Sequence, residues 1–226
     1  MNAITIKQTQ TRIRIKARIC FRGDTALKID GEDAKTLIKD ELTRQFSYEN
    51  PYFRDWQGSD FDFPERKGQR IKLTFEIEET KKKPCVSFHL FDFSAVSCML
   101  FFPQWRPEKN KHILMFTRDR RAKRALTSRE FGMVACHEFG HAMGVNDLYR
   151  AFIKYALKTQ QAAPVNPETP ANDIMRTCYR SDWFTPNDIE MAVYAAAERC
   201  PQTHEALRLY RGLNRVSKAV RYGSKS

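Results

Sequence analysis

The sequence predicts a mixed α/β domain in which one helix carries two closely spaced histidines, and three observations support this fold class. Residues 11–21 alternate apolar and basic side chains with a period of two, as in a strand with one solvated face. Residues 32–46 and 127–143 instead place apolar side chains at helical spacing. A length of 226 residues with a hydrophobic share of 42% is enough for one domain with a proper core.

The charge balance suggests an anionic partner without naming one. The 39 Lys and Arg residues against 27 Asp and Glu residues give a net charge of +12. Nucleic acid, a membrane or wall surface, or an acidic protein would suit this charge, and so would a basic surface with no dedicated ligand. The sequence shows no dedicated nucleic-acid motif. No uncharged run approaches the roughly 18 residues of a transmembrane segment.

The start of the chain and the cysteines bear on its compartment. Residues 1–21 contain no apolar core of a classical signal peptide, so we expect a cytoplasmic protein or one exported by a leaderless route. The cysteines form no Cys-x-x-Cys pair, which argues against a zinc ribbon and against a dense disulfide framework. Their even number permits bridges, but reduced thiols are favoured. The six are Cys20, Cys85, Cys98, Cys136, Cys178 and Cys200.

The first strand and the first helix follow from their side-chain periods. In the strand over 11–21, apolar side chains face the core, and the basic side chains on the other face are Arg12, Arg14, Lys16 and Arg18. In the helix over 32–46, the apolar stripe consists of Ala34, Leu37, Ile38, Leu42 and Phe46. Residues 47–67 are aromatic, acidic and rich in turn residues, and predict a long loop.

Four more strands are expected before the second helix. The extended segments are 70–78, 86–93, 95–102 and 112–117. The lysines at 81–83 separate the first two as a solvated turn would. The strongly basic run 118–124 reads as a solvated connector or as a patch for an anionic partner.

Helix-start signals mark the second half of the chain. Thr127-Ser-Arg-Glu130 has the form of a capping box and predicts a helix that continues to about residue 143. Thr185-Pro-Asn-Asp188 predicts the start of a helix over 189–199. We also expect a short helix over 148–157, a loop over 160–172 and one more helix after residue 201. The order of elements is therefore β-α-β-β-β-β-α, followed by a loop and helices.

The run from His137 to Asp147 carries the chemistry. On a helix, His137 and His141 lie one turn apart on one face, so both imidazoles can converge on one metal ion. Glu138 is close enough to reach a water at that ion and to act as a general base. Gly144 is suited to end the helix, because glycine accepts a positive φ. The turn would bring Asp147 back as a third ligand and leave a fourth position open.

This run resembles the extended zinc motif His-Glu-x-x-His-x-x-Gly-x-x-His/Asp of the metzincin metallopeptidases, in the Asp form found in snapalysin-like members. Five fixed positions arise by chance in on the order of one in ten thousand chains of this size. Metzincins also have a Met-turn, and Asp173-Ile174-Met175-Arg176 resembles it. The resemblance covers about residues 11–200, although only the zinc motif is strongly specific.

The resemblance implies a fold, a cofactor and site residues. The fold would be a zincin with a twisted, mixed five-stranded sheet, a zinc-binding helix, a Met-turn at Met175 and a C-terminal helix. One catalytic domain would span 1–226, with a sheet subdomain at about 11–144 and a second subdomain at about 145–226. The zinc ligands would be His137, His141 and Asp147, with Glu138 as the catalytic base. An edge strand within 95–103 would pair with an extended substrate.

The pattern departs from the family at two places, and two other side chains have competing interpretations. Asp147 is a harder and shorter ligand than the more usual His. Tyr179 is offset from the position of the tyrosine that assists the metal or oxyanion in some metzincins, so it is either a catalytic residue or an ordinary packed one. Cys136 is expected as a small core residue rather than a ligand, because its azimuth on the helix differs by about 100° from that of His137. His89 is expected to be structural.

The leading hypothesis is a zinc-dependent endopeptidase that acts on a protein or peptide substrate. One alternative is a basic binding module on a metzincin scaffold with little catalysis, for which the positive charge would have to gather on one face. Another keeps the enzyme but makes it a secreted effector or toxin, which cleaves a host protein or a cell-wall peptide and is restrained by an immunity or inhibitor protein.

Overall fold

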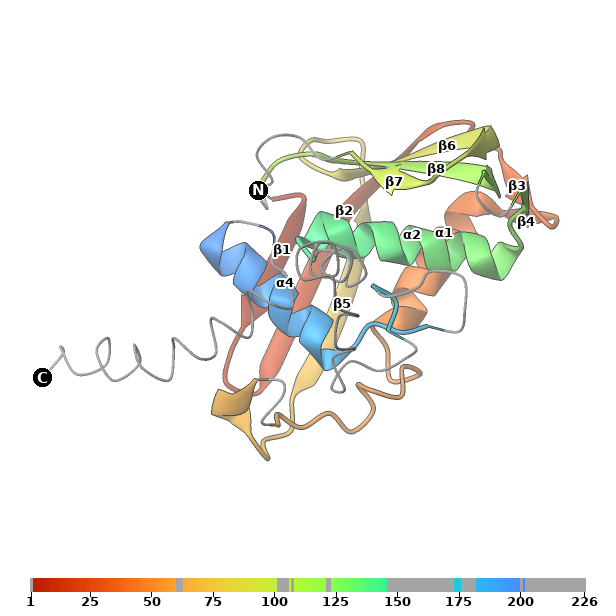
Figure 1. Cartoon of the computed structure of the whole chain (residues 1–226). Coiled ribbons are helices and arrows are strands. Elements are labelled where there is room, and N and C mark those ends of the chain that lie inside the picture. The colour runs from red at the N-terminus through yellow and green to blue at the C-terminus, as the bar shows by residue number, and fades with distance from the viewer. Residues whose placement is uncertain are drawn as a thin grey trace, which may run out of the picture.

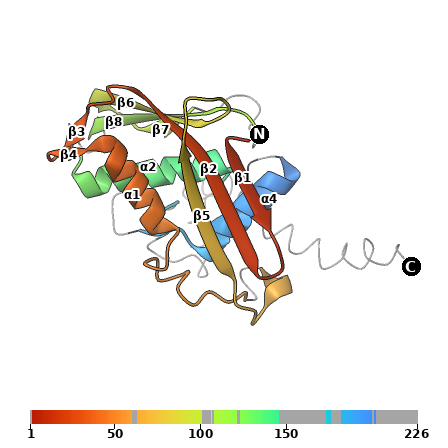
Figure 2. The same cartoon turned by 180° about the vertical axis from the view of Figure 1, so that it is seen from behind.

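The computed structural model describes residues 2–59, 63–100, 106, 108–120, 123–145, 173–175, 182–199 and 201. These residues form a mixed α/β fold in which helices pack against a mixed sheet (Figures 1 and 2). The α-helices are α1 (Ala34–Gln45), α2 (Ser128–Met143) and α4 (Pro186–Glu198), and η1 (Pro64–Arg66) is a short 3-10 helix. The helices expected over 148–157 and after residue 201, and the loop over 160–172, lie outside the described residues.

The main sheet has seven strands in the described part of the chain. Its order is β1-β2-β6-β8-β7, with β5 also beside β2 and β9 also beside β8. Parallel pairs join β2 to β5, β2 to β6 and β6 to β8, while β1, β7 and β9 pair antiparallel. The strands are β1 (Ile4–Gln8), β2 (Arg12–Gly23), β5 (Lys72–Glu79), β6 (Val86–Ala95), β7 (Cys98–Met99), β8 (Lys111–Asp119) and β9 (Arg124–Ala125). Strands β3 (Lys28–Ile29) and β4 (Glu32–Asp33) form a separate small sheet.

The predicted mixed α/β class is confirmed, but the predicted five-stranded sheet lacks two of the strands that the structure shows. All five expected strands are present as β2, β5, β6, β7 and β8. Two strands are added, because β1 pairs along residues 13–17 of β2 and β9 folds back onto the end of β8. The basic run 118–124 is therefore partly a hairpin rather than only a connector. A strand was expected over 95–102. Of these residues, Ala95 belongs to the end of β6, and the described part of the strand is the short β7.

Strand β2 shows the expected alternation with one exception. Ile13, Ile15 and Ile19 are fully buried against the helices. Arg18, expected on the solvated face, is only 4% exposed. Its burial has a physical reason, because the guanidinium contacts Glu78 at 3.3 Å and donates to the carbonyl oxygen of Pro84 at 2.9 Å.

Helix α2 begins and ends at the expected residues. The Thr127 side chain accepts from the backbone of Glu130, and the Glu130 side chain accepts from the backbone of Thr127, so the capping box is complete. Gly144 ends the helix with φ of 94°, a left-handed conformation that glycine adopts without strain. Every residue of α2 from 131 to 143 is buried, because the helix contacts α1, α4, β7 and β8. The motif helix is therefore the centre of the domain.

Candidate active site

Helix α2 carries His137, Glu138 and His141 in its buried C-terminal half. Their side chains are 3%, 7% and 5% exposed, respectively. The two imidazole rings have centroids 4.8 Å apart and stand at 85° to each other. The one-turn spacing predicted from the sequence therefore places both rings side by side, within the protein rather than on its surface.

Both imidazoles are oriented by backbone carbonyl groups. His137 Nδ1 lies 2.8 Å from the carbonyl oxygen of Ile174, and His141 Nδ1 lies 2.8 Å from that of Val145. Because a carbonyl oxygen only accepts hydrogen bonds, each Nδ1 carries the hydrogen. In the neutral form of each ring, the lone pair is then on Nε2, which is the atom left to bind a metal.

The segment 173–175, which resembles a Met-turn, lies directly against the motif helix. Met175 is fully buried, and a Cβ built on Gly140 would lie 2.4 Å from Met175 Sδ and 3.1 Å from Phe184 Cε1. Gly140 lies between His137 and His141 in the sequence, and only glycine at this position leaves room for the Met175 sulfur. Together with the bond from His137 to Ile174, this contact joins the two motifs that the sequence separates by more than thirty residues.

A buried pair of carboxyl groups holds the segment 173–175 in place. Asp173 Oδ1 accepts from the Met175 amide at 2.8 Å, and Ile174 donates its amide to the carbonyl oxygen of Trp183 at 3.0 Å. The hydroxyl oxygen of Thr185 lies 3.1 Å from Asp173 Oδ2 and 3.0 Å from Asp188 Oδ2. These contacts tie the segment to the start of α4.

The hydroxyl group of Thr185 has one hydrogen for two carboxyl groups, so one carboxyl group must supply its own. Asp188 Oδ2 also accepts the Thr185 amide at 2.8 Å, and the additional proton is held by this pair of carboxyl groups. Burial, followed by the nearby Asp188, raises the pKa of Asp173 well above its usual value. Burial also raises the pKa of Asp188 to about 7.

The carboxylate of Glu138 is held by the edge strand. Its Oε2 accepts from the Met99 amide at 2.6 Å. Met99 belongs to β7, where the neighbouring Leu100 amide donates to the carbonyl oxygen of His112 on β8 at 2.8 Å. Since successive amides of a strand point to opposite sides, the Met99 amide faces away from β8. The general-base candidate therefore lies beside the backbone edge that the resemblance assigns to substrate binding.

The residues present fit a zinc ion, although the full ligand set is not in view. Two imidazoles with Nε2 lone pairs and an adjacent carboxylate suit zinc, which prefers nitrogen, sulfur and carboxylate ligands. Asp147, the expected third ligand, and Tyr179 lie outside the described residues. Within the ranges that the structure describes, no group of three or more His, Cys, Asp or Glu side chains is arranged to hold a metal ion.

Two other candidates from the sequence occupy structural positions. Cys136 is fully buried on α2, and burial raises the pKa of its thiol well above the usual value. His89 Nε2 lies 2.9 Å from Nδ1 of His112, which joins β6 to β8. The expected interpretations, a core thiol and a structural histidine, agree with these positions.

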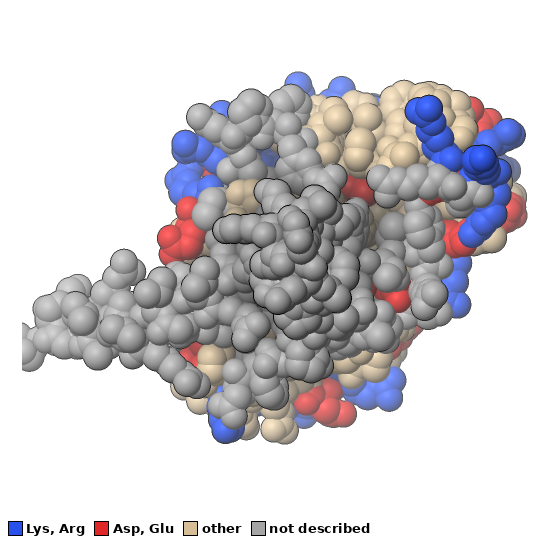
Figure 3. Space-filling view, viewed as in Figure 1, with Lys and Arg blue, Asp and Glu red and all other residues tan. Residues whose placement is uncertain are grey.

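The basic face of β2 is partly neutralised by its neighbour β5. Arg14 contacts Glu76 at 2.6 Å, and Lys16 contacts Glu78 at 2.8 Å. On the face shown in Figure 3, Lys and Arg side chains lie around the margin with Asp and Glu side chains between them. The two ion pairs therefore neutralise part of the positive charge on this stretch of sheet.

Sequence reasoning missed the groups that support the candidate site. Backbone donors and acceptors such as the Met99 amide and the Ile174 carbonyl have no side-chain signature. The pairing of Asp173 with Asp188 had a weak signal, because Asp188 was already visible as the acidic member of a helix start. The glycine at position 140 also carried a signal, since a glycine within a buried helix often marks a close contact.

Comparison with known proteins gives no match, either among protein-family models or among curated proteins. The described residues contain no helix that is both long and apolar enough to cross a membrane.

Proposed function

We propose that this protein is a zinc-dependent endopeptidase with the zincin fold of the metzincins. The observation that carries the proposal is the orientation of the two motif imidazoles by backbone carbonyls, one of which belongs to the segment resembling a Met-turn. A helix with two incidental histidines would not need both Nδ1 atoms fixed and both rings buried side by side. His137, His141 and Asp147 would hold the metal.

The residues around the proposed metal have separate tasks in peptide hydrolysis. When bound, zinc supplies a Lewis acid that lowers the pKa of water and polarises a carbonyl group. Glu138 takes a proton from the attacking water onto its carboxylate and then delivers it to the nitrogen of the leaving amine. The Met99 amide keeps this carboxylate in position through a 2.6 Å hydrogen bond. The carbonyl groups of Ile174 and Val145 keep Nε2 of each imidazole as the ligating atom.

The substrate is proposed to be an extended peptide that lies along β7. In the described residues, β7 is the last strand of the sheet order, and the backbone amide of Met99, which faces away from β8, lies beside Glu138. An exposed strand edge binds an extended chain through main-chain hydrogen bonds. A scissile bond held there would lie next to the base. Tyr179 remains a candidate for stabilising the oxyanion.

The proposal is tested by peptide hydrolysis with a matched variant. Glu138→Gln keeps the size of the side chain and an acceptor oxygen for the Met99 amide, but it removes the base. We expect the variant to retain zinc, measured by metal analysis, and to lose at least a hundredfold in the cleavage rate of a mixed peptide library. Undiminished cleavage by Glu138→Gln would overturn the proposed role of Glu138 and the proposed mechanism.

A further inference from the structure

A pair of cysteines lies on the far side of the sheet from the candidate active site. Cys20 on β2 and Cys85, directly before β6, bring their Sγ atoms to 3.1 Å. Their backbones are adjacent because β2 and β6 pair in parallel, with Ile19 beside Val86 and Cys20 beside Ser87. Cys20 is 5% exposed and Cys85 is fully buried.

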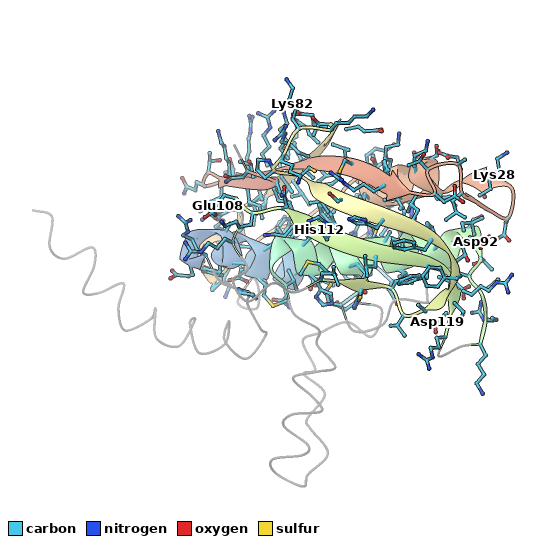
Figure 4. All side chains as sticks on the ribbon, turned by 90° about the horizontal axis from the view of Figure 1, so that it is seen from above. Lys28, Lys82, Asp92, Glu108, His112 and Asp119 are labelled. Atoms are coloured by element: carbon cyan, nitrogen blue, oxygen red, sulfur yellow. The ribbon has the colours of Figure 1, made fainter. Side chains whose placement is uncertain are left out.

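The alternation of β2 fixes the side of the sheet on which this pair lies. Cys20 shares its face with Arg18 and Arg22, whereas Ile19 points into the core. The next residue across the sheet from Ser87 is His112 on β8, labelled in Figure 4, where the view is onto the sheet from above. The pair is therefore separated from α2 by the sheet itself.

The two thiols have different environments. Burial raises the pKa of Cys20, but hydrogen bonds with Ser87, Cys85 and Arg22 outweigh burial, so its pKa lies below the usual value. Ser87 Oγ lies 3.1 Å from Cys20 Sγ. For Cys85, burial and then the contact with Cys20 raise the pKa. Cys20 is also the more exposed of the two, so it is the first thiol that a peroxide reaches, and Cys85 is the thiol positioned to react with it afterwards.

We propose that Cys20 and Cys85 form a redox-active dithiol that a peroxide converts to an intramolecular disulfide. The thiolate of Cys20 attacks one oxygen of the peroxide, which breaks the O–O bond and gives a sulfenic acid and hydroxide or alkoxide. The sulfur of Cys85 then attacks the sulfur of that sulfenic acid. The new S–S bond forms as the S–O bond breaks, and the proton of Cys85 leaves with the oxygen as water.

The disulfide would join β2 to the beginning of β6 and close a loop between residues that are 65 positions apart. A cross-link over a loop of this length restricts the unfolded chain more than the folded one. Oxidation is therefore expected to raise the melting temperature by several degrees. This effect is independent of the proposed peptidase activity, because the pair lies outside the candidate active site.

The test uses the full chain treated with hydrogen peroxide, then alkylated and digested without reducing agent. We expect a peptide cross-linked between Cys20 and Cys85 as the main product, with a loss of two hydrogen atoms per chain and a higher melting temperature. The variant Cys98→Ser, at a half-buried cysteine elsewhere in the sheet, is expected to form the same cross-link.

A second variant tests the order of the two steps. Cys85→Ser is expected to lose the cross-link and to accumulate a Cys20 sulfenic acid that dimedone traps. The proposal is overturned if peroxide leaves both thiols of the wild-type chain open to alkylation after unfolding, or if Cys20 is linked mainly to another cysteine. The wild-type result stands even if the Cys85→Ser variant does not fold.

Discussion

The buried carboxyl pair under the candidate active site makes the stability of this protein depend on pH in an unusual direction. Asp188 is fully buried, and burial raises its pKa to about 7. In the unfolded chain the same group ionises near the ordinary value of 3.8. Between these two values the folded chain keeps a proton that the unfolded chain has lost, so the free energy of unfolding falls as the pH rises. The stabilisation is fully present below pH 3.8 and is lost as the pH passes 7.

The magnitude follows from the two pKa values. A pKa shift from 3.8 to about 7 corresponds to a largest contribution of about 4 kcal/mol to the free energy of unfolding. Between pH 5 and pH 8 the linkage equation gives a loss of about 2–3 kcal/mol. In the wild type, the Thr185 amide donates to Asp188 Oδ2 at 2.8 Å. The substitution Asp188→Asn removes the titrating group but keeps an oxygen that can accept this hydrogen bond. The variant should therefore lack this part of the pH dependence.

The assay is urea unfolding of the wild type and of Asp188→Asn at pH 5 and at pH 8. From pH 5 to pH 8, the free energy of unfolding of the wild type should fall by about 2–3 kcal/mol relative to that of the variant. Asp40→Asn, on the exposed side of α1, is the control for the loss of one carboxyl group. A difference for Asp188→Asn that does not change with pH would refute the assignment of a proton to this buried pair.

Three further predictions concern α2 and the metal. Gly140→Ala should lower stability by up to about 2 kcal/mol, since overpacking against Met175 costs about 1–3 kcal/mol and the gain in helix propensity returns only about 1 kcal/mol. Gly132→Ala, on the same helix, should lose less in a thermal melt, because its Cβ would lie 3.0 Å from the nearest atom, Glu41 Cβ, against 2.4 Å from Met175 Sδ at Gly140. Thr127→Ala should cost about 1 kcal/mol in urea unfolding, because it removes the helix cap. Zinc at about a hundred times its dissociation constant should stabilise the chain by about 2.7 kcal/mol, and His141→Ala or a chelator should abolish that gain in a thermal melt.

Each of these has a result that would count against it. A Gly140→Ala chain as stable as Gly132→Ala would mean that the sulfur of Met175 does not pack where the structure has it. An unchanged unfolding free energy for Thr127→Ala would remove the capping box as a source of stability. Equal stabilisation of the wild type and His141→Ala by zinc would show that the metal binds elsewhere.

Local signals in the sequence were sufficient for the elements that carry the motif. The boundaries of α2 follow from two local rules, the capping box at Thr127 and the left-handed glycine at position 144. The alternation in β2 likewise identifies its buried face. Strand β1 was missed because it is only five residues long and is stabilised by its partner β2 rather than by its own pattern. Arg18 was misplaced for a related reason, since its burial depends on Glu78 and Pro84 in distant segments.

In the candidate site, too, some features follow from the local sequence and others depend on distant segments. The spacing of His137, Glu138 and His141 was enough to place three side chains on one helix. Their orientation depends on the backbone of segments that the sequence does not join, such as the Ile174 carbonyl and the Met99 amide. The proton shared around Thr185 depends on the burial of two acids, and burial is a property of the whole fold.

The most direct test of the account is the zinc content of the purified chain after dialysis, measured by elemental analysis beside His137→Ala and His141→Ala. Tightly bound zinc at one ion per wild-type chain, absent from both variants, is the predicted result. A wild-type chain that retains no more zinc than the two variants would contradict a metal site at these histidines, and the proposed peptidase mechanism with it.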